Sequence, residues 1–483
     1  MSQARAPEAP GSARATMSLA TLTAMVVGGM VGAGVFTLPA RFGVATGVVG
    51  SLIAWTIAGA GMLTLAFVFQ NLAVRKPELD SGVFVYAKAG FGDFAGFTSA
   101  IGFWASAVAG NAFYLVFIAA TLGAFVPALG EGDTVLAVVL ASVGVWLFHL
   151  LVARGVRGAA ALNRVVTVFK VLPILAFVVI LVISADAGIL RANLFDYGDL
   201  GGLGEQVRNT MIVTTFVFIG IEGASVYSRF ARRREDVGRA TVLGFLSVLS
   251  IFALVTLSSF AVLPRAEIAD TRQPSMAGVL ESVVGPWGTT FVSVGVVVSV
   301  LGAYLAWTLM AAEVLFHPAR SADLPRAFAR ENRAGTPIVA LLVTSLAAQL
   351  LLLATLLVSD ALDFMLDLCT SLALIPYLLA AGYAVKLAVT GDGYEGVDPS
   401  VRRRQGIVAG LAVGYTVFLF VAAGLTFLLL STVILAPLTL LYVCARRENH
   451  RPLFTRAEAV ACAVVVLSAV VGVLALATGR IVL

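Results

Sequence analysis

The chain has 483 residues, of which 60% are hydrophobic and only 12% are charged. A soluble domain carries about twice that charged fraction, so the composition excludes a soluble protein and indicates an integral membrane protein. The formal net charge of +5 does not indicate a nucleic-acid partner, because the basic residues gather in loops on one predicted side of a lipid bilayer.

Thirteen apolar runs are long enough to cross a membrane as helices, since a span needs roughly 20 such residues. No alternation of polar and apolar residues occurs, so the predicted fold is all-α and not a barrel. Almost no polar loop separates the eleventh run from the twelfth. The predicted spans are 17–40, 44–70, 96–125, 134–153, 165–184, 208–229, 240–263, 287–315, 337–358, 361–389, 406–424, 427–445 and 457–479.

The N-terminal segment 1–16 is rich in Ala, Pro, Arg and Ser and is predicted to be a disordered tail. It lacks the short apolar segment and cleavage site of a signal peptide. With this tail in the cytoplasm, most Lys and Arg residues fall on the cytoplasmic side, as the positive-inside rule requires, and thirteen spans place the C-terminus outside. The basic residues left outside are Arg41, Arg191, Arg208, Arg265, Arg272 and Arg480.

Glycines interrupt the first and the sixth predicted spans. Four of them fall between Gly28 and Gly34, and the sixth span carries Glu222 between Gly220 and Gly223. Glycines weaken a helix, and a carboxylate inside a span costs roughly 3 kcal/mol or more unless it has partners. Five spans separate the two starts, so the two spans run in opposite directions through the membrane. Such paired weak points in inverted halves indicate a midplane site for a transported solute.

Two structural interpretations of the weak points remain open, and two other classes of membrane protein need motifs that this chain does not have. The glycines could serve close helix packing, and the acid could be hydrogen-bonded inside a packed bundle. An intramembrane enzyme needs clustered nucleophiles or metal ligands, but the three histidines are isolated and the three cysteines fall in apolar runs, as small core residues do. No metal or cofactor is therefore expected. A channel usually repeats a short pore loop around a symmetry axis, which this chain does not.

Four motifs occur in order along the chain: Gly-x-Gly-Val-Phe-x-Leu-Pro at 32–39, and the runs 218–226, 301–309 and 328–337. With them the chain resembles the amino acid–polyamine–organocation (APC) superfamily, in particular its basic amino acid/polyamine antiporters. Among these, the closest likeness is to arginine/ornithine antiporters.

This resemblance implies two inverted five-helix repeats, the LeuT-like fold, in a transporter core at 17–390, with accessory helices at 391–483. It implies exchange of arginine, ornithine or lysine across the cytoplasmic (inner) membrane by alternating access. Proton-coupled amino acid uptake is the alternative, since nothing in the sequence separates it from exchange. Protons and a homodimer are partners that the resemblance leaves open.

The resemblance also assigns roles to residues at the two weak points. Backbone amides around Gly32, Ala33 and Gly34 would hold the substrate carboxylate, because N–H groups freed at a helix break favour an anion. Arginine antiporters often have Ser where this chain has Ala33, so one hydroxyl contact is missing here.

The remaining carried-over contacts concern the substrate's two cationic groups. Carbonyls of Met30, Phe216 and Ile219 would accept the α-ammonium. Phe216 stands where the arginine/agmatine antiporter has a tryptophan lid and keeps an aromatic face. Trp307 matches a tryptophan on which the substrate's guanidinium stacks; core packing is the alternative for this mid-span residue.

Four more residues match polar, gating or coupling positions of the family. Asn111 would contact the substrate, or else form an interhelical hydrogen bond. Phe103 and Tyr377 align with gate tyrosines, although Phe103 lacks the hydroxyl. Lys170 would act as a tethered cation joining the fifth span to the first, or would snorkel to the interface. Glu222 would change protonation as the site opens and closes.

Overall fold

The structure is a computed structural model that describes residues 18–79, 83–155, 159–194, 200–221, 234–358 and 360–481. Over these residues the chain is helical, and the only strand-like pairing is an isolated bridge between Glu331 and Pro337. The predicted tail at 1–16 and Glu222 lie outside the described residues. The helices are α1 (Leu19–Met30), η1 (Gly34–Thr37), α2 (Leu38–Ala45), α3 (Val48–Arg75), α4 (Val83–Phe91), α5 (Asp93–Gly123), η2 (Pro127–Leu129), α6 (Val135–Ala153), α7 (Ala159–Ile183), α8 (Ala187–Leu194), α9 (Leu203–Val217), α11 (Arg234–Ser259), α12 (Arg265–Ala269), α13 (Ser275–Val284), α14 (Pro286–Arg320), η4 (Arg326–Ala329), α15 (Ile338–Ala354), η5 (Thr355–Leu357), α16 (Ala361–Thr390), α17 (Pro399–Glu448) and α18 (Arg456–Ala477).

Among the described residues, 9 helices are long and apolar enough to cross a membrane, or up to 11 if each of two bent pairs is one span. The predicted eleventh and twelfth spans lie in the single 50-residue helix α17, which is interrupted by the non-helical Gly424 (φ 78°, ψ 168°). The predicted sixth span begins in α9 and continues beyond the described residues. The structure therefore shows an all-helical membrane protein, and the count of thirteen stays a prediction.

Short helices occupy the loops between spans, where the sequence predicted none. α8 turns by 99° from the end of α7, and α12 and α13 lie between α11 and α14. α13 is tied to the first predicted span, because Ser275 Oγ donates to the Phe36 carbonyl and accepts from the Ala40 N–H, both at 3.2 Å. Loop helices of this kind carry too little apolar surface to resemble a span in the sequence.

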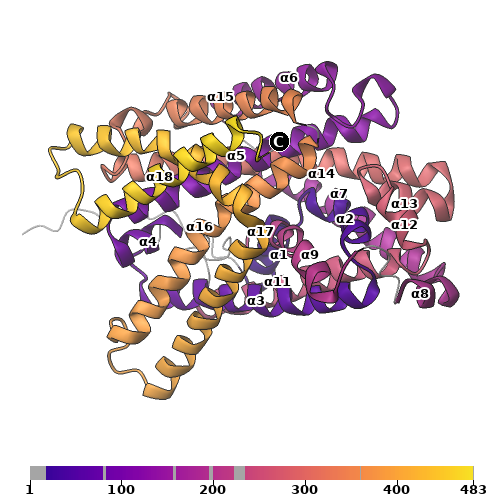
Figure 1. Cartoon of the computed structure of the whole chain (residues 1–483), viewed down its shortest axis with the longest axis horizontal. Helices are drawn as coiled ribbons and strands as arrows, with labels where there is room; N and C mark the ends of the chain where they lie inside the picture. Colours follow the sequence, from indigo (N-terminus) through magenta and orange to yellow (C-terminus); the bar gives the residue numbers. More distant parts are fainter. Residues whose placement is uncertain are drawn as a thin grey trace, which may run out of the picture.

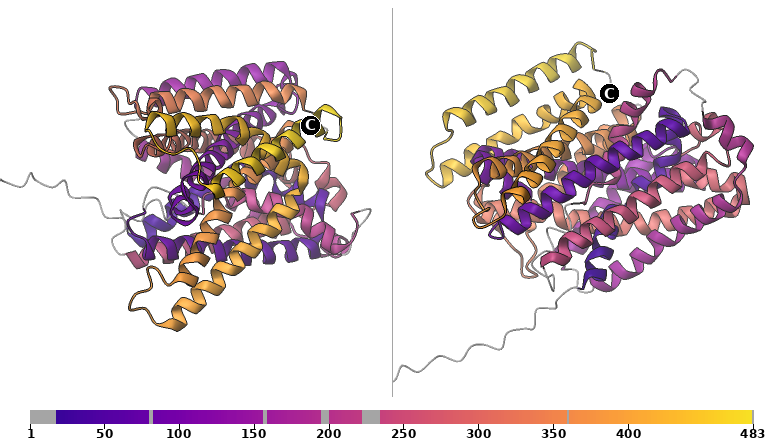
Figure 2. Two further views of the ribbon diagram at one scale, coloured as in Figure 1. Left: turned by 60° about the vertical axis from the view of Figure 1, so that its left-hand side comes forward. Right: turned by 90° about the horizontal axis from the view of Figure 1, so that it is seen from below.

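Helix α5 passes through the middle of the bundle, while α18 lies at its edge (Figures 1 and 2). In its most apolar stretch, 94% of α5 residues are buried, against 11% of those in α18. α6 and α15 run along one side of the bundle, joined by a hydrogen bond from Trp146 Nε1 to Gln349 Oε1 at 3.2 Å. The apolar faces that α6 and α18 leave exposed are suited to lipid, whereas α5 is surrounded by protein.

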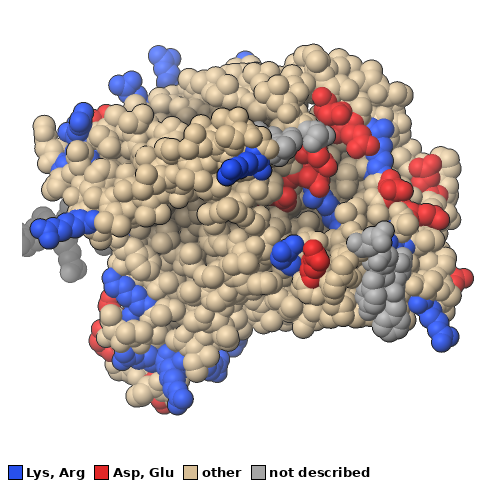
Figure 3. Space-filling model, viewed as in Figure 1, with Lys and Arg blue, Asp and Glu red and all other residues tan. Residues whose placement is uncertain are grey.

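Charged side chains are distributed unevenly between the two ends of the bundle (Figure 3). Most of the Lys and Arg side chains in that view lie toward the left end, and most Asp and Glu side chains toward the right. This separation along the helix axes is what the positive-inside rule produces in a membrane protein.

A set of ion pairs, here called the ion network, joins the end of α17 and the loop after it to α4, α5 and the segment after α14. Asp93 at the start of α5 pairs with Arg446 near the end of α17 and, at 3.4 Å, with Lys88 of α4. Asp323, after α14, pairs with Lys88 at 2.6 Å and with Arg451 at 3.6 Å. Each carboxylate therefore meets two cations from different elements, so the network holds four segments of the chain together.

Candidate substrate site

The first predicted span is broken. α1 ends at Met30, Val31 is extended (φ −75°, ψ 92°), and the chain resumes as η1 and α2 at an angle of 48° to α1. No backbone hydrogen bond from the N–H groups of Gly32 and Ala33 occurs among the described residues. Glycines permit this geometry, and the freed N–H groups are suited to an anion.

Lys170 donates to the Gly28 carbonyl, which this break leaves without its helical N–H donor. In an unbroken helix the Gly28 carbonyl would accept from the Gly32 N–H. Here Lys170 Nζ donates to Gly28 O at 3.1 Å, and the lysine is only 5% exposed. The side chain therefore links α7 to α1, and its role as a tethered cation stays a prediction.

The sixth predicted span is broken as well. α9 ends at Val217, and the next turn is held by short-range bonds, among them Ile221 N–H to Phe218 O at 3.2 Å. Gly220 has a φ of 108°, which L-residues with a side chain rarely adopt. A Cβ on Gly220 would lie 2.9 Å from the carbonyl oxygen of Gly29. The two breaks therefore touch, and only glycine fits where they meet.

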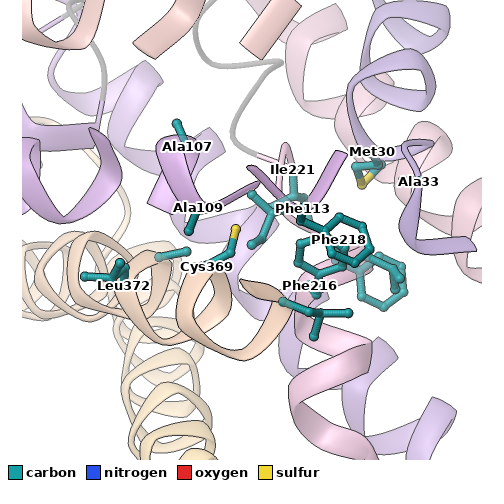
Figure 4. Packing of buried hydrophobic residues seen from close by; sticks show 14 of the residues in the cluster. Met30, Ala33, Ala107, Ala109, Phe113, Phe216, Phe218, Ile221, Cys369 and Leu372 are labelled. Atoms are coloured by element: carbon teal, nitrogen blue, oxygen red, sulfur yellow. The ribbon is translucent and has the colours of Figure 1, made fainter. Parts of the chain in front are cut away.

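A cavity of about 20 Å³ lies beside the two breaks. Its walls come from the first span, α5, α9, α14 and α16. Figure 4 shows the apolar packing in this region, with Met30, Ala33, Phe216 and Phe218 toward the right of the view and Ala109 of α5 and Cys369 of α16 toward the left. This volume holds about one water, whereas ligand pockets usually measure about 300 Å³ or more. An amino acid can enter only after the surrounding helices move apart, so the structure is a closed state.

Most of the predicted substrate-binding residues line this cavity. They are Met30, Gly32, Gly34, Phe216, Ile219 and Trp307. Ala33 lies between two lining residues but is itself fully buried. The aromatic ring of Phe216 packs edge-on against Phe113 of α5, with centroids 5.1 Å apart. Trp307 is half-buried and its ring lies 6.2 Å from that of Phe103, so one predicted stacking residue and one predicted gate are neighbours.

Asn111 and Tyr377 are buried behind the cavity wall. Asn111 Nδ2 donates to Thr308 Oγ1 of α14 at 3.3 Å, which is the interhelical bond that the sequence left as an alternative. Its Oδ1 has no partner among the described residues. Tyr377 packs edge-on against Phe69 of α3 at 5.7 Å. Neither residue lines the cavity in this closed state, so their substrate and gate roles remain predictions.

On the opposite side of the break from α1, α2 is linked to α16 by an ion pair. Arg41 of α2 pairs with Asp363 in the first turn of α16. Because the arginine side chain is only 12% exposed, this pair holds α2 against α16. The site is therefore flanked by a lysine bond on α1 and an ion pair on α2.

Comparison with known proteins identifies the family of this fold. The amino acid permease model matches residues 17–440. The chain belongs to the amino acid permease family, within the APC superfamily. It is 46% identical to an arginine/ornithine antiporter of Pseudomonas aeruginosa, over 96% of this chain and 98% of that protein. It is 39% identical to an L-lysine transport protein of Corynebacterium glutamicum, over 96% of each chain. An arginine/agmatine antiporter of Chlamydia pneumoniae is 33% identical, over 95% of this chain and 96% of that one.

The family assignment confirms the resemblance and makes the protein a transporter, not an enzyme. The motif at 32–39 forms the first break with η1, and the motif at 218–226 begins the second. The motif at 301–309 places Trp307 on the cavity wall. Three of the permease's four motifs thus lie where its helices break or meet the cavity, and the fourth, at 328–337, lies in the loop before α15.

Several lining residues of the permease were not predicted, most of them on α5 and α16. Ser106 Oγ of α5 donates to the Cys369 carbonyl of α16 at 2.7 Å, and both residues reach the cavity. Tyr114 is one turn beyond Asn111 on the same helix. Its mid-span position, away from both interfaces, was the available signal, as it was for Trp307. The other unpredicted lining residues are Gly29, Ala107, Gly110 and Val217.

One prediction about the cysteines was wrong. Cys369 is buried, but Cys444 lies exposed on α17 and Cys462 is partly exposed on α18. An apolar run does not distinguish a side chain facing lipid from one facing the protein core, because both surroundings are apolar.

Proposed function

We propose that this permease exchanges cationic amino acids, arginine for ornithine with lysine as a further substrate, across the cytoplasmic membrane by alternating access. The observation that carries the proposal is the contact of two broken spans beside a cavity with Trp307 on its wall. Full-length similarity to an arginine/ornithine antiporter and an L-lysine transport protein supports the choice of substrate.

The chemistry of the cavity suits an amino acid. The free N–H groups of Gly32 and Ala33 can bind a carboxylate. Carbonyls at the ends of α1 and α9, those of Met30, Phe216 and Ile219, can accept from the α-ammonium. The Trp307 face can hold a distal cation by a cation–π contact. Arginine and ornithine carry equal charge, so their exchange is electroneutral and the membrane potential does not drive it.

The architecture of the proposal follows the family. It comprises thirteen spans, two inverted five-helix repeats at 17–390 and accessory helices at 391–483, with the N-terminus in the cytoplasm. The basic loops and the separation of charge in Figure 3 support this orientation. Lys170, bonded to the first break, would act as a tethered cation, and Glu222 would change protonation as the site opens and closes, so that the exchange rate depends on pH. The proposal leaves open whether the protein forms a homodimer.

Counterflow in liposomes tests the exchange. We expect purified protein to take up labelled arginine into vesicles loaded with ornithine, with little uptake into empty vesicles and no effect of an imposed membrane potential. Vesicles without protein provide the background. Competition by unlabelled lysine and ornithine, and none by neutral amino acids, is expected.

Two outcomes would contradict the proposal in different ways. Uptake into empty vesicles that requires an inward proton gradient would support the uptake symporter instead of the exchanger. Competition by neutral amino acids alone would overturn the cationic substrate class and leave only an amino acid permease.

A further inference from the structure

Tyr114 is a buried tyrosine of α5 whose hydroxyl makes no hydrogen bond among the described residues. The residue is 7% exposed and lines the cavity beside the two breaks. Its ring lies 6.1 Å from that of Phe113, and its hydroxyl interacts electrostatically with the Cys369 thiol across the cavity wall. A hydroxyl in a buried cavity is less stable without a hydrogen bond than with one, so such a group indicates a ligand that completes it.

The hydroxyl lies directly over the first break. A Cβ built on Gly32 would be 2.9 Å from Tyr114 Oη, so a side chain at position 32 would meet the phenol. The same short stretch of backbone presents the N–H groups of Gly32 and Ala33, which also have no backbone partner. One O–H group and two N–H groups, all unbonded, therefore gather at one wall of the cavity.

This set of donors selects the kind of ligand group that fits. The N–H groups can only donate, so an ammonium or guanidinium finds no acceptor in them. A carboxylate has two oxygens with about four acceptor positions and can take all three donors at once. Hydrogen bonds to an ionised acceptor are also the stronger ones, which favours the carboxylate further.

Tyr114 also supplies a side-chain hydroxyl, which residue 33 of the first break does not have. Ala33 contributes a methyl group and no side-chain hydroxyl to this wall. The neighbouring helix α5 places the phenol of Tyr114 over the same turn, and Gly32 leaves the space that the phenol needs. The side-chain donor missing from the first span is thus available from α5.

We propose that Tyr114 Oη binds the α-carboxylate of the transported amino acid, so that the permease selects amino acids over the amines formed from them by decarboxylation. The inference rests on the proposed function, because it needs an amino acid in this cavity. It assigns the carboxylate contact to a side chain of α5 in addition to the backbone of the first span.

Binding to the Tyr114→Phe variant tests the inference, because Phe keeps the ring and removes only the hydroxyl. Affinities for arginine, argininamide and agmatine are measured on purified full-length protein by competition with labelled arginine. Argininamide keeps the α-ammonium but has no carboxylate charge, and agmatine lacks the carboxyl group. We expect Tyr114→Phe to bind arginine about 10-fold more weakly and to bind the other two ligands within about two-fold of wild type.

Tyr442→Phe is the matched control. Tyr442 of α17 is also buried, and its hydroxyl also lacks a partner among the described residues, but its ring packs with Phe94, Phe97 and Phe454 away from the cavity. Removing this hydroxyl should leave all three affinities unchanged. Melting temperatures of both variants without ligand should match or exceed that of wild type, because neither loses a hydrogen bond.

The outcomes separate the inference from the proposed function. If wild type binds arginine but Tyr114→Phe loses arginine and agmatine affinity equally, or loses neither, the inference is overturned and the proposed function stands. If Tyr114→Phe is poorly folded, the wild-type protein provides the test. Its melting temperature is measured with saturating arginine and with saturating argininamide, and equal shifts would contradict a carboxylate contact. Wild-type protein that binds no cationic amino acid overturns both.

Discussion

Three polar groups beside the cavity have no hydrogen-bond partner among the described residues, whereas the charged groups of the ion network are paired. The three groups are Tyr114 Oη and the N–H groups of Gly32 and Ala33. In the ion network, Lys88 Nζ reaches both oxygens of Asp323 at 2.6 Å, and Arg446 bonds both Asp93 and the Pro452 carbonyl. The ion network is also nearer the surface, since the side chains of Lys88 and Asp93 are 32% and 31% exposed.

This difference predicts which variants should change ligand binding and which should change the stability of the folded protein. An unbonded buried group is costly in the empty protein and recovers that cost when a ligand binds. A bonded group has already formed its contacts, so its removal weakens the folded state and leaves the ligand unaffected. We therefore expect variants beside the cavity to change transport or affinity, and variants in the ion network to change the melting temperature.

The largest effect should come from the contact between the two breaks. Gly220→Ala adds a Cβ 2.9 Å from the Gly29 carbonyl oxygen at a φ of 108°. The unfavourable backbone alone costs roughly 1–2 kcal/mol, and the clash pushes the breaks apart. We expect exchange in liposomes, per folded protein, to fall at least about 30-fold.

Gly410→Ala is the control for that variant. A Cβ at Gly410 of α17 has no atom within 4 Å, so this substitution should leave exchange at the wild-type rate. If Gly220→Ala exchanged as fast as Gly410→Ala, the contact between the breaks would have no part in transport.

An intermediate effect is expected at Trp307. If its ring holds the distal cation of the substrate, Trp307→Leu should weaken arginine binding by about 1–2 kcal/mol, and Trp307→Phe by less, because a benzene face attracts a cation less strongly. Calorimetric titration and a melting curve are measured on each variant. A lower melting temperature with equal arginine affinity in all three proteins would show that Trp307 serves packing alone.

The smallest effect should come from the ion network. Arg446→Met removes one of the two cationic partners of Asp93, which is 31% exposed, so we expect the free energy of unfolding to fall by only about 1 kcal/mol. The melting temperature in detergent should fall by about 2 °C, with arginine affinity unchanged. Arg447→Met, at the exposed neighbouring position, is the control and should change neither. Weaker arginine binding by Arg446→Met would contradict the expectation that variants in the ion network change stability and leave ligand binding unaffected.

Motif and composition predicted a large part of the cavity wall. The glycine-rich run of the first span and the mid-span Trp307 are unusual for their places in the sequence, and the family resemblance added Phe216. The structure brings all of them to the cavity. Ser106, Tyr114 and Cys369 were missed, because their share in the wall depends on how α5 packs against α16 and the first span. Helix packing of this kind is set by contacts between distant segments.

By itself, the sequence determined that the protein lies in a membrane, approximately where most spans begin and end, and where two of them break. Those properties are local, because the hydrophobicity of about 20 neighbouring residues decides a span and glycine weakens the helix in which it occurs. Only the tertiary structure decided that Gly29 and Gly220 touch, that Lys170 reaches the Gly28 carbonyl, and that the Tyr114 hydroxyl finds no hydrogen-bond partner within the described part of the chain. The reason is that hydrogen bonding and close packing depend on which atoms of distant helices come together when the bundle assembles.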